Sequence, residues 1–275
     1  MKILITGAKG QLGSQLLKHL EQHHVIGADR EEMDLGSKAS IQQFLEKIQP
    51  DAIIHCGAYT AVDRAEDEED LCLLVNSESV KIMADYCKDK KALLIFISTD
   101  YVFDGTKEGE YTEVDAPNPQ SVYGRSKALA ERYIKERLDK YFIVRISWVF
   151  GEGANFVRTM LRLAERGSLN VVADQYGSPT YTVDLAPVLG KMLESSKYGT
   201  YHVTNEGTIS WHQFAEKIFE TAGLTVSVNP VSTAEYPTKA PRPKNSRLSK
   251  VKLEDAGFGR LPSWEDALER YLRDI

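Results

Sequence analysis

The feature that most constrains the fold is a glycine-rich turn between a strand pattern and a helix pattern near the amino terminus. Residues 2–6 are mostly apolar and β-branched, as a strand buried on both faces requires. Gly7, Gly10 and Gly13 follow, and a helical pattern starts at Gln11. Glycines at such a turn let the chain reverse tightly and let a pyrophosphate approach the backbone at a helix amino terminus. The stretch therefore predicts a dinucleotide site on a doubly wound parallel α/β sheet, the Rossmann architecture.

A second predicted strand, residues 24–28, ends at Asp29 and Arg30. A carboxylate here can bind the ribose hydroxyls of an adenosine, and a neighbouring arginine can hold a 2′-phosphate. The presence of both leaves NADH and NADPH open as the cofactor. Asp34 precedes a predicted helix at residues 38–48 and has two interpretations, contact with adenine or capping of that helix.

The alternation of strands and helices continues to about residue 150 and then weakens. Strands are predicted at residues 51–55, 92–97 and 142–146, and one helix is predicted over residues 71–88. We therefore expect a nucleotide-binding domain over residues 1–150. Residues 151–275 are expected to form mainly a smaller α/β lobe for the substrate, with an approximate boundary across which elements can interleave. The predicted elements of this part are helices at 156–166, 182–195, 210–222 and 264–271 and short strands at 169–173 and 201–204.

Tyr123 and Lys127 lie one turn apart on one face of a helix predicted to begin near Val122. An ammonium beside a phenol favours the phenolate and lowers its pKa, which makes the tyrosine a better proton donor to a carbonyl that is accepting hydride. Ser98 or Thr99, at the end of a predicted strand, can polarise the same carbonyl. The alternative is a surface Tyr–Lys pair and hydroxyls that merely close a strand.

Two further stretches leave alternatives open. Trp148 follows the strand at 142–146 and either stacks on a ligand ring or belongs to the core. Residues 237–245 contain three prolines with Lys239, Arg242 and Lys244. This loop can clamp a diphosphate, or it can be a solvated surface loop.

Composition excludes several classes of protein. The formal net charge is −6 and no basic domain is present, which argues against a nucleic-acid partner. Cys56, Cys72 and Cys87 have no metal-ligand spacing, so no metal is predicted and a reducing, cytoplasmic setting is expected. The sequence shows no signal peptide and no membrane-spanning apolar run, so no membrane partner is expected.

Six motifs together resemble the extended short-chain dehydrogenase/reductase family, and within it the dTDP-4-dehydrorhamnose reductases. They are Gly7-Ala-Lys-Gly-Gln-Leu-Gly13, Gly57-Ala-Tyr-Thr-Ala-Val-Asp63, Ser98-Thr-Asp-Tyr-Val-Phe-Asp-Gly105, Tyr123-Gly-Arg-Ser-Lys127, Arg145-Ile-Ser-Trp-Val-Phe-Gly151 and Gln175-Tyr-Gly-Ser-Pro-Thr180. The motifs span roughly two thirds of the chain. The strand-end motif at Ser98–Gly105 is the most discriminating of the six, because sister epimerases usually carry a different sequence there.

The resemblance implies a reaction and a set of site residues. The reaction is the reduction of the C4 carbonyl of a dTDP-linked 6-deoxy-hexulose by NADPH or NADH, the last step of dTDP-L-rhamnose synthesis. Thr99, Tyr123 and Lys127 would form the catalytic trio. Expected substrate contacts are Val62, Thr99, Asp100 and Trp148. Expected cofactor contacts are Gly7, Gly10, Gln11, Leu12, Gly13, Asp29, Arg30, Asp34, Leu35, Ala58, Tyr59, Thr60, Tyr123 and Lys127.

One position departs from the pattern of the family. Some members dimerise through magnesium held by acids, one of them in the helix after the glycine turn. The matching residue here is Gln15, which offers no carboxylate. We therefore expect a monomer or a homodimer without a magnesium bridge.

Two rival interpretations remain. Another reductase or epimerase of nucleotide sugars, acting on GDP- or UDP-sugars, would carry much of the same pattern. A non-catalytic regulatory subunit that binds the dinucleotide is the rival from outside enzymes, because one relative of this family binds methionine adenosyltransferase and turns over no sugar. The complete set of Thr99, Tyr123 and Lys127 favours catalysis.

Overall fold

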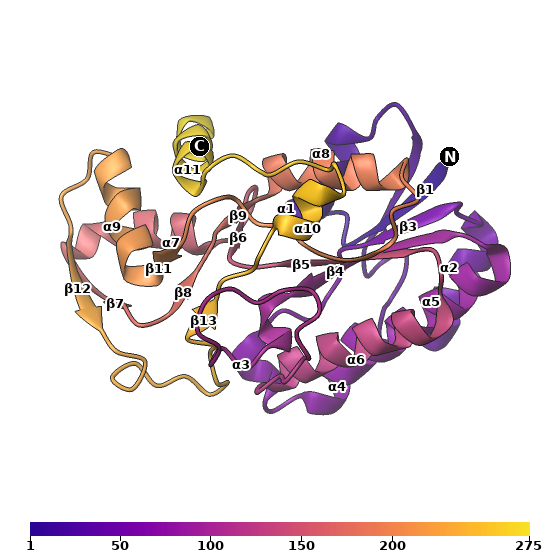
Figure 1. The fold of residues 1–275 in the computed structure, drawn as a ribbon, viewed down its shortest axis with the longest axis horizontal. Coiled ribbons are helices and arrows are strands. Elements are labelled where there is room, and N and C mark those ends of the chain that lie inside the picture. Colours follow the sequence, from indigo (N-terminus) through magenta and orange to yellow (C-terminus); the bar gives the residue numbers. More distant parts are fainter.

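The computed structural model describes all residues, 1–275, and is built on a six-stranded parallel sheet (Figure 1). The strand order is β2–β1–β3–β4–β5–β10, and every neighbouring pair is parallel. The order changes direction between β1 and β3, which is where open α/β sheets bind ligands. The strands are β1 (Lys2–Thr6), β2 (His24–Ala28), β3 (Ala52–His55), β4 (Leu93–Thr99), β5 (Tyr141–Ile146) and β10 (Gly199–His202).

Helices cover both faces of this sheet, which confirms the doubly wound architecture (Figure 1). Ile3 and Ile5 pack in the core with one helical layer, whereas Leu4 between them packs with the other. This two-residue alternation explains why the strands are apolar on both faces. One layer contains α1 (Gln11–His19), α8 (Thr182–Leu193) and α10 (Val251–Asp255). The other contains α2 (Lys38–Ile48), α5 (Ser79–Lys90) and α6 (Val122–Arg137).

The region predicted as a single helix over residues 71–88 is interrupted. It consists of α4 (Glu69–Leu73), a π-helical turn η1 (Leu74–Glu78) and α5. Asn76 in the π turn bonds the backbone of Tyr59, with Tyr59 N–H donating to its Oδ1 at 2.7 Å and its Nδ2 donating to the Tyr59 carbonyl at 3.1 Å. The bulge therefore fixes the loop after β3, a use that hydrophobic periodicity does not indicate. The other short elements of this half are α3 (Val62–Ala65) and the 3₁₀ turn η2 (Asp100–Val102).

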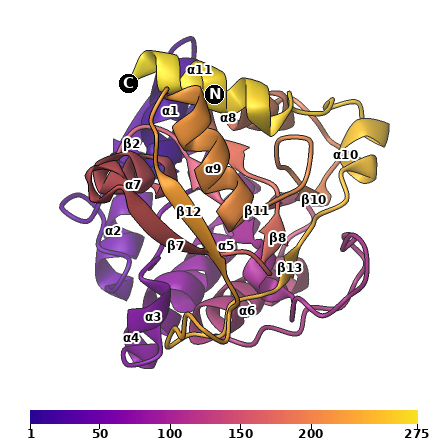
Figure 2. The same ribbon diagram turned by 90° about the vertical axis from the view of Figure 1, so that its left-hand side faces the viewer.

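A smaller lobe lies beyond the carboxyl ends of the strands (Figure 1), and Figure 2 views the molecule from the side of this lobe. The lobe has a core of its own. Three amphipathic helices supply most of this core, namely α7 (Phe156–Leu163), α9 (Trp211–Thr221) and α11 (Trp264–Asp274). The remaining elements are β6 (Val149–Phe150), η3 (Ala164–Arg166), β7 (Ser168–Val172), β8 (Tyr176–Gly177), β9 (Thr180–Tyr181), β11 (Ile209–Ser210), β12 (Ser227–Val231) and β13 (Asn245–Ser246).

Most predicted elements agree with the structure within a few residues, but several short strands escaped prediction. β12 pairs in parallel with β7 although it contains Pro230 and polar residues, as edge strands tolerate. β8 lies inside the motif at residues 175–180, where no strand was predicted. α8 and β10 follow residue 150 in the chain, yet they pack on and in the main sheet. No helix combines the length and the apolar character needed to cross a membrane.

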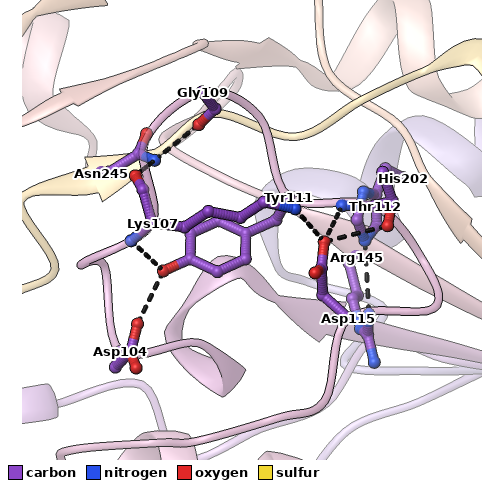
Figure 3. A network of polar contacts seen from close by, with 9 residues as sticks. All are labelled: Asp104, Lys107, Gly109, Tyr111, Thr112, Asp115, Arg145, His202 and Asn245. Carbon is purple, nitrogen blue, oxygen red and sulfur yellow. Dashed lines mark hydrogen bonds and ion pairs between the residues drawn. The ribbon is translucent and has the colours of Figure 1, made fainter.

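The long loop at residues 105–120 is fastened to the smaller lobe (Figure 3). The Tyr111 hydroxyl donates to Asp104 Oδ1 at 2.7 Å and accepts from the Lys107 N–H at 3.1 Å. Asn245 of β13 donates from Nδ2 to the carbonyls of Lys107 and Gly109, each at 2.7 Å. The loop is therefore ordered by side chains that close it from inside and from the carboxyl-terminal third of the chain.

Candidate active site

A cavity of about 560 Å³ lies where the carboxyl ends of β1, β3, β4 and β5 face the smaller lobe. It brings together segments that are far apart in the chain: the glycine turn, the loop after β3, the end of β4, the start of α6, the residues after β5 and the start of α9. Its lining residues are Gly7, Gly10, Gln11, Leu12, Gly13, Asp29, Cys56, Gly57, Ala58, Thr60, Val62, Ile97, Ser98, Thr99, Asp100, Tyr101, Tyr123, Lys127, Ile146, Ser147, Trp148, Val149 and Trp211.

The glycine turn is shaped to receive phosphate. Gly7 has φ +64°, which favours glycine, and a Cβ on Gly13 would lie 2.1 Å from the Gly7 carbonyl oxygen. α1 begins after Gly10 with no side-chain cap, so its first N–H groups are free to bind an anion. Gln11 Oε1 is buried without a hydrogen-bond partner. A bound pyrophosphate would accept hydrogen bonds from these N–H groups, and a donor group of the ligand would pair with Gln11 Oε1.

At the end of β2, only one of the two residues predicted to bind the adenosine ribose or its 2′-phosphate lies at the cavity. The Asp29 carboxylate lines the cavity and accepts from the Lys9 N–H at 3.0 and 3.2 Å. Arg30 does not line the cavity, and its side chain is 89% exposed. Nothing in this arrangement selects between a 2′-hydroxyl and a 2′-phosphate.

The capping interpretation of Asp34 is wrong. Ser37 caps α2, accepting from the Ser40 N–H at 3.3 Å, whereas Asp34 Oδ1 accepts from the Gly36 N–H at 2.9 Å within a turn. Neither Asp34 nor Leu35 lines the cavity. A Cβ on Gly57 would lie 2.9 Å from Leu35 Cδ1, so Leu35 supports the loop from behind.

The loop after β3 forms the floor of the cavity. Gly57 donates its N–H to Thr6 Oγ1 at 3.1 Å, and Ala58, Thr60 and Val62 line the cavity. Tyr59 does not line it, because its hydroxyl donates outward to Glu68 at 2.5 Å.

The predicted catalytic residues converge on the cavity. Thr99 ends β4, donates from Oγ1 to Asp100 Oδ1 at 2.9 Å and accepts from the Tyr101 N–H at 3.2 Å. Tyr123 lies in the first turn of α6, which Ser121 caps by accepting from the Gly124 N–H at 3.1 Å. Lys127 follows one turn later and is 3% exposed, with its Nζ 4.1 Å from the centre of the Phe96 ring.

Burial governs the ionisation of this group. It raises the pKa of Tyr123 above its ordinary value, and the charge of Asp100 adds to the rise while Thr99 opposes it. Burial lowers the pKa of Lys127 to about 7, against the opposing charge of Glu131. It also raises the pKa of Asp100 to about 6, although the Ser246 and Thr99 hydroxyls donate to its carboxylate. The expected lowering of the Tyr123 pKa by Lys127 is therefore not found, and burial, which disfavours the charged phenolate, sets the direction instead. The phenol is held in its proton-donating form.

A buried ion pair beneath the cavity was not predicted. Arg145 of β5 donates to Glu131 of α6 through Nε at 2.8 Å and Nη2 at 2.6 Å, and both side chains are almost fully buried. Ser98 Oγ donates to the same carboxylate at 2.7 Å. An arginine inside an otherwise apolar strand was the available signal, because a buried charge requires a partner.

Trp148 lines the cavity and stacks on Trp211, with ring centres 3.7 Å apart and an interplanar angle of 16°. It is thus half-buried rather than simply core. Trp211 is the lining residue that sequence reasoning missed most clearly, because it is distant in the chain and belongs to no motif. The other unpredicted lining residues lie within two positions of predicted ones, as Cys56, Tyr101 and Ser147 do.

The basic loop at 237–245 is paired with acids near the cavity. Arg242 forms an ion pair with Asp63 at 2.6 Å and donates to the Tyr101 hydroxyl at 2.9 Å. Lys239 pairs with Asp67. The loop therefore bridges the smaller lobe and the nucleotide-binding half through these ion pairs. Residues 237–239, Pro241 and Lys244 are nevertheless exposed to solvent, and no residue of the loop lines the cavity.

Comparisons with known proteins agree with this geometry. The family model described as "RmlD substrate binding domain" matches residues 1–275. The chain is 43% identical to the dTDP-4-dehydrorhamnose reductase of Aggregatibacter actinomycetemcomitans, an alignment that covers 98% of this chain and 97% of the relative.

Solved structures give the same result. The dTDP-4-dehydrorhamnose reductase of Bacillus anthracis in complex with NADP superposes with a TM-score of 0.96 at 45% identity, covering 100% of this chain and 99% of that one. The UDP-glucose 4-epimerase of Thermus thermophilus, at 21% identity and a TM-score of 0.85 over 99% of this chain and 98% of that one, shares the fold. The chain therefore belongs to the RmlD substrate binding domain family, together with the dTDP-4-dehydrorhamnose reductases.

Proposed function

We propose that this protein reduces the C4 carbonyl of dTDP-4-dehydro-L-rhamnose to dTDP-L-rhamnose with NADPH or NADH. The observation that carries the proposal is a single cavity lined both by the glycine turn and by Thr99, Tyr123 and Lys127. The family membership supports it, because relatives that align over nearly the whole chain are named for this reaction.

The proposed cofactor site consists of the predicted contacts that line the cavity. The turn from Gly7 to Gly13 would hold the pyrophosphate, Asp29 the adenosine ribose, and Ala58 and Thr60 would border the dinucleotide. Arg30, Asp34, Leu35 and Tyr59 do not line the cavity, so we leave them outside the proposed set. The bound nicotinamide cofactor supplies a hydride.

The three catalytic residues have separate roles in the proposed mechanism. Tyr123 donates its phenolic proton to the oxygen that becomes negative at C4, and burial favours the protonated phenol from which this transfer starts. Thr99 hydrogen-bonds the same oxygen and so stabilises its charge. Lys127 holds ribose hydroxyls and, when charged, stabilises the tyrosinate that remains after proton transfer.

The substrate would lie between the two halves of the molecule. Val62, Asp100 and Trp148 line the cavity and are proposed to contact the sugar nucleotide. We assign nucleotide binding mainly to residues 1–150 and sugar-nucleotide binding mainly to residues 151–275, with α8 and β10 of the latter part belonging structurally to the main sheet. We also propose a monomer or a homodimer without a magnesium bridge, in a reducing cytoplasm that suits the three free thiols.

The test is oxidation of NADPH and of NADH with dTDP-4-dehydro-L-rhamnose, made in situ from dTDP-glucose by the two preceding enzymes, followed by product analysis. We expect dTDP-L-rhamnose and no turnover of GDP- or UDP-linked 4-keto sugars. A preferred GDP- or UDP-sugar would favour the rival nucleotide-sugar enzymes. Binding of the dinucleotide without turnover of any sugar would favour a regulatory subunit.

A further inference from the structure

Trp148 has a backbone conformation that bulky residues rarely adopt. Its φ is +50°, in the left-handed region, between β5 and β6 at the edge of the cavity. Neighbouring bonds hold this segment in place: the Trp148 carbonyl accepts from the Thr180 N–H at 3.2 Å, and the Ser147 hydroxyl donates to the Ser178 carbonyl at 2.7 Å. Strain of this kind persists where the surroundings fix it, and it is concentrated at functional sites.

The neighbours of the Trp148 indole form a slot. One face stacks on Trp211 at 3.7 Å, and Trp211 itself packs against Phe156 with ring centres 4.5 Å apart. A Cβ on Gly177 would lie 2.9 and 3.0 Å from indole atoms of Trp148. Gly177 does not have a positive φ, so clearance for the indole, rather than backbone freedom, explains the glycine.

The secondary structure of the smaller lobe holds this slot together. Trp211 is the first residue of α9, whose cap Ser210 forms a reciprocal capping box with Gln213. β11 ends at this cap and pairs with β8, with Ile209 opposite Gly177. Trp211 and Gly177, which flank the Trp148 indole, are therefore held in place relative to each other by the pairing of β11 with β8.

We propose that Trp211 is a positioning residue that holds the Trp148 indole over the sugar site. Together the two indoles form an apolar wall that selects a 6-deoxy sugar, so Trp211 also determines specificity. The inference rests on the proposed function for the identity of the sugar. Both indoles line the same cavity as Thr99 and Tyr123. Indole faces pack well against the apolar face and methyl group of a deoxy sugar, whereas a 6-hydroxyl placed there would lose its hydrogen bonds.

The first test needs no turnover. Stacked indoles couple electronically, so circular dichroism of the wild type should show an exciton couplet. Trp148→Phe and Trp211→Phe should each abolish it. Trp264→Phe should retain it, because Trp264 is in the core of the smaller lobe and does not line the cavity. A couplet that survives in Trp211→Phe would overturn the stacking on which the proposal depends.

The second test measures the sugar contribution to binding, with thermal melting to select folded variants. In Trp211→Ala, the affinity for dTDP-L-rhamnose relative to dTDP should fall at least about tenfold, and the KM for the keto sugar should rise more than kcat falls. Affinities for dTDP and NADPH should stay unchanged, and Trp211→Phe should recover part of the loss. An unchanged ratio of dTDP-L-rhamnose to dTDP affinity would overturn the inference. A wild type that neither reduces the keto sugar nor prefers dTDP-L-rhamnose over dTDP would instead overturn the proposed function.

Discussion

At the scale of single residues, Asp100 is a buried carboxyl group whose ionisation lowers the stability of the folded protein. The side chain is 3% exposed, and burial raises its pKa from the usual 3.8 to about 6. Between these two values the folded state binds the proton more tightly than the unfolded state, so stability falls as the pH rises. The loss in the free energy of unfolding that ionised Asp100 causes is absent below the lower pKa. It is complete above the higher pKa, where it amounts to about 3 kcal/mol.

Asp100→Asn removes this titration. The free energy of unfolding of the variant, relative to wild type, should therefore rise by about 2 kcal/mol between pH 4 and pH 7. Urea unfolding at the two pH values measures it. Asp104→Asn is the matched control, because hydrogen bonds from Thr106, Tyr111 and Asn118 lower the pKa of Asp104 and its pH dependence has the opposite sign. Parallel pH dependences of Asp100→Asn and wild type would contradict the account.

At the scale of elements, α6 does more than present Tyr123 and Lys127. One turn beyond Lys127 it carries Glu131, which pairs with Arg145 of β5 and accepts from Ser98 at the end of β4. The helix and the neighbouring strands β4 and β5 are thus held in register by one buried carboxylate. Its charge also opposes the fall of the Lys127 pKa.

Glu131→Gln leaves the Arg145 guanidinium buried without a counter-charge. We expect a loss of about 3–5 kcal/mol in the free energy of unfolding. Replacing both residues together, as Glu131→Met with Arg145→Leu, should restore most of it, because the two apolar replacements leave neither a carboxylate nor a guanidinium buried without its partner. Urea unfolding of the two variants decides the point. A double variant no more stable than Glu131→Gln would show that the pair does not act as a unit.

At the scale of the whole molecule, the basic loop joins the two halves beside the cavity. Asp63 accepts from Arg242 Nη2 at 2.6 Å and from the Ala240 N–H at 3.0 Å, whereas Asp67 pairs only with the half-exposed Lys239. The first contact is stronger because it is partly buried and is supported by the backbone; exposed ion pairs contribute about 0–1 kcal/mol.

Asp63→Ala should release this loop and Asp67→Ala should not. Limited trypsin digestion measures the difference through cleavage after Lys239, since Pro243 blocks cleavage after Arg242. We expect cleavage after Lys239 to be several-fold faster in Asp63→Ala than in the wild type. In Asp67→Ala the rate should equal that of the wild type. Equal rates for the two variants would mean that Arg242 does not fasten the loop.

The sequence was most informative where function depends on local order. The strand–glycine–helix pattern predicted β1, α1 and β2, and the spacing of Tyr123 and Lys127 predicted one face of α6, because backbone periodicity determines both. Contacts made by tertiary packing escaped prediction: Trp211 against Trp148, Glu131 against Arg145, and the π turn at Asn76. The desolvation of Tyr123 depends on the same packing and could not be predicted either. The predicted lowering of the Tyr123 pKa was therefore wrong, because burial raises it.

The central claim is that Tyr123 is the proton donor in a cavity whose other residues make most of the cofactor contacts. The most direct measurement is a single-turnover experiment on Tyr123→Phe with dTDP-4-dehydro-L-rhamnose, combined with titration of NADPH binding. We expect hydride transfer to slow by at least about 100-fold. The NADPH dissociation constant should stay within a few-fold of wild type, because the glycine turn and Asp29 are untouched. Hydride transfer at the wild-type rate would contradict the claim.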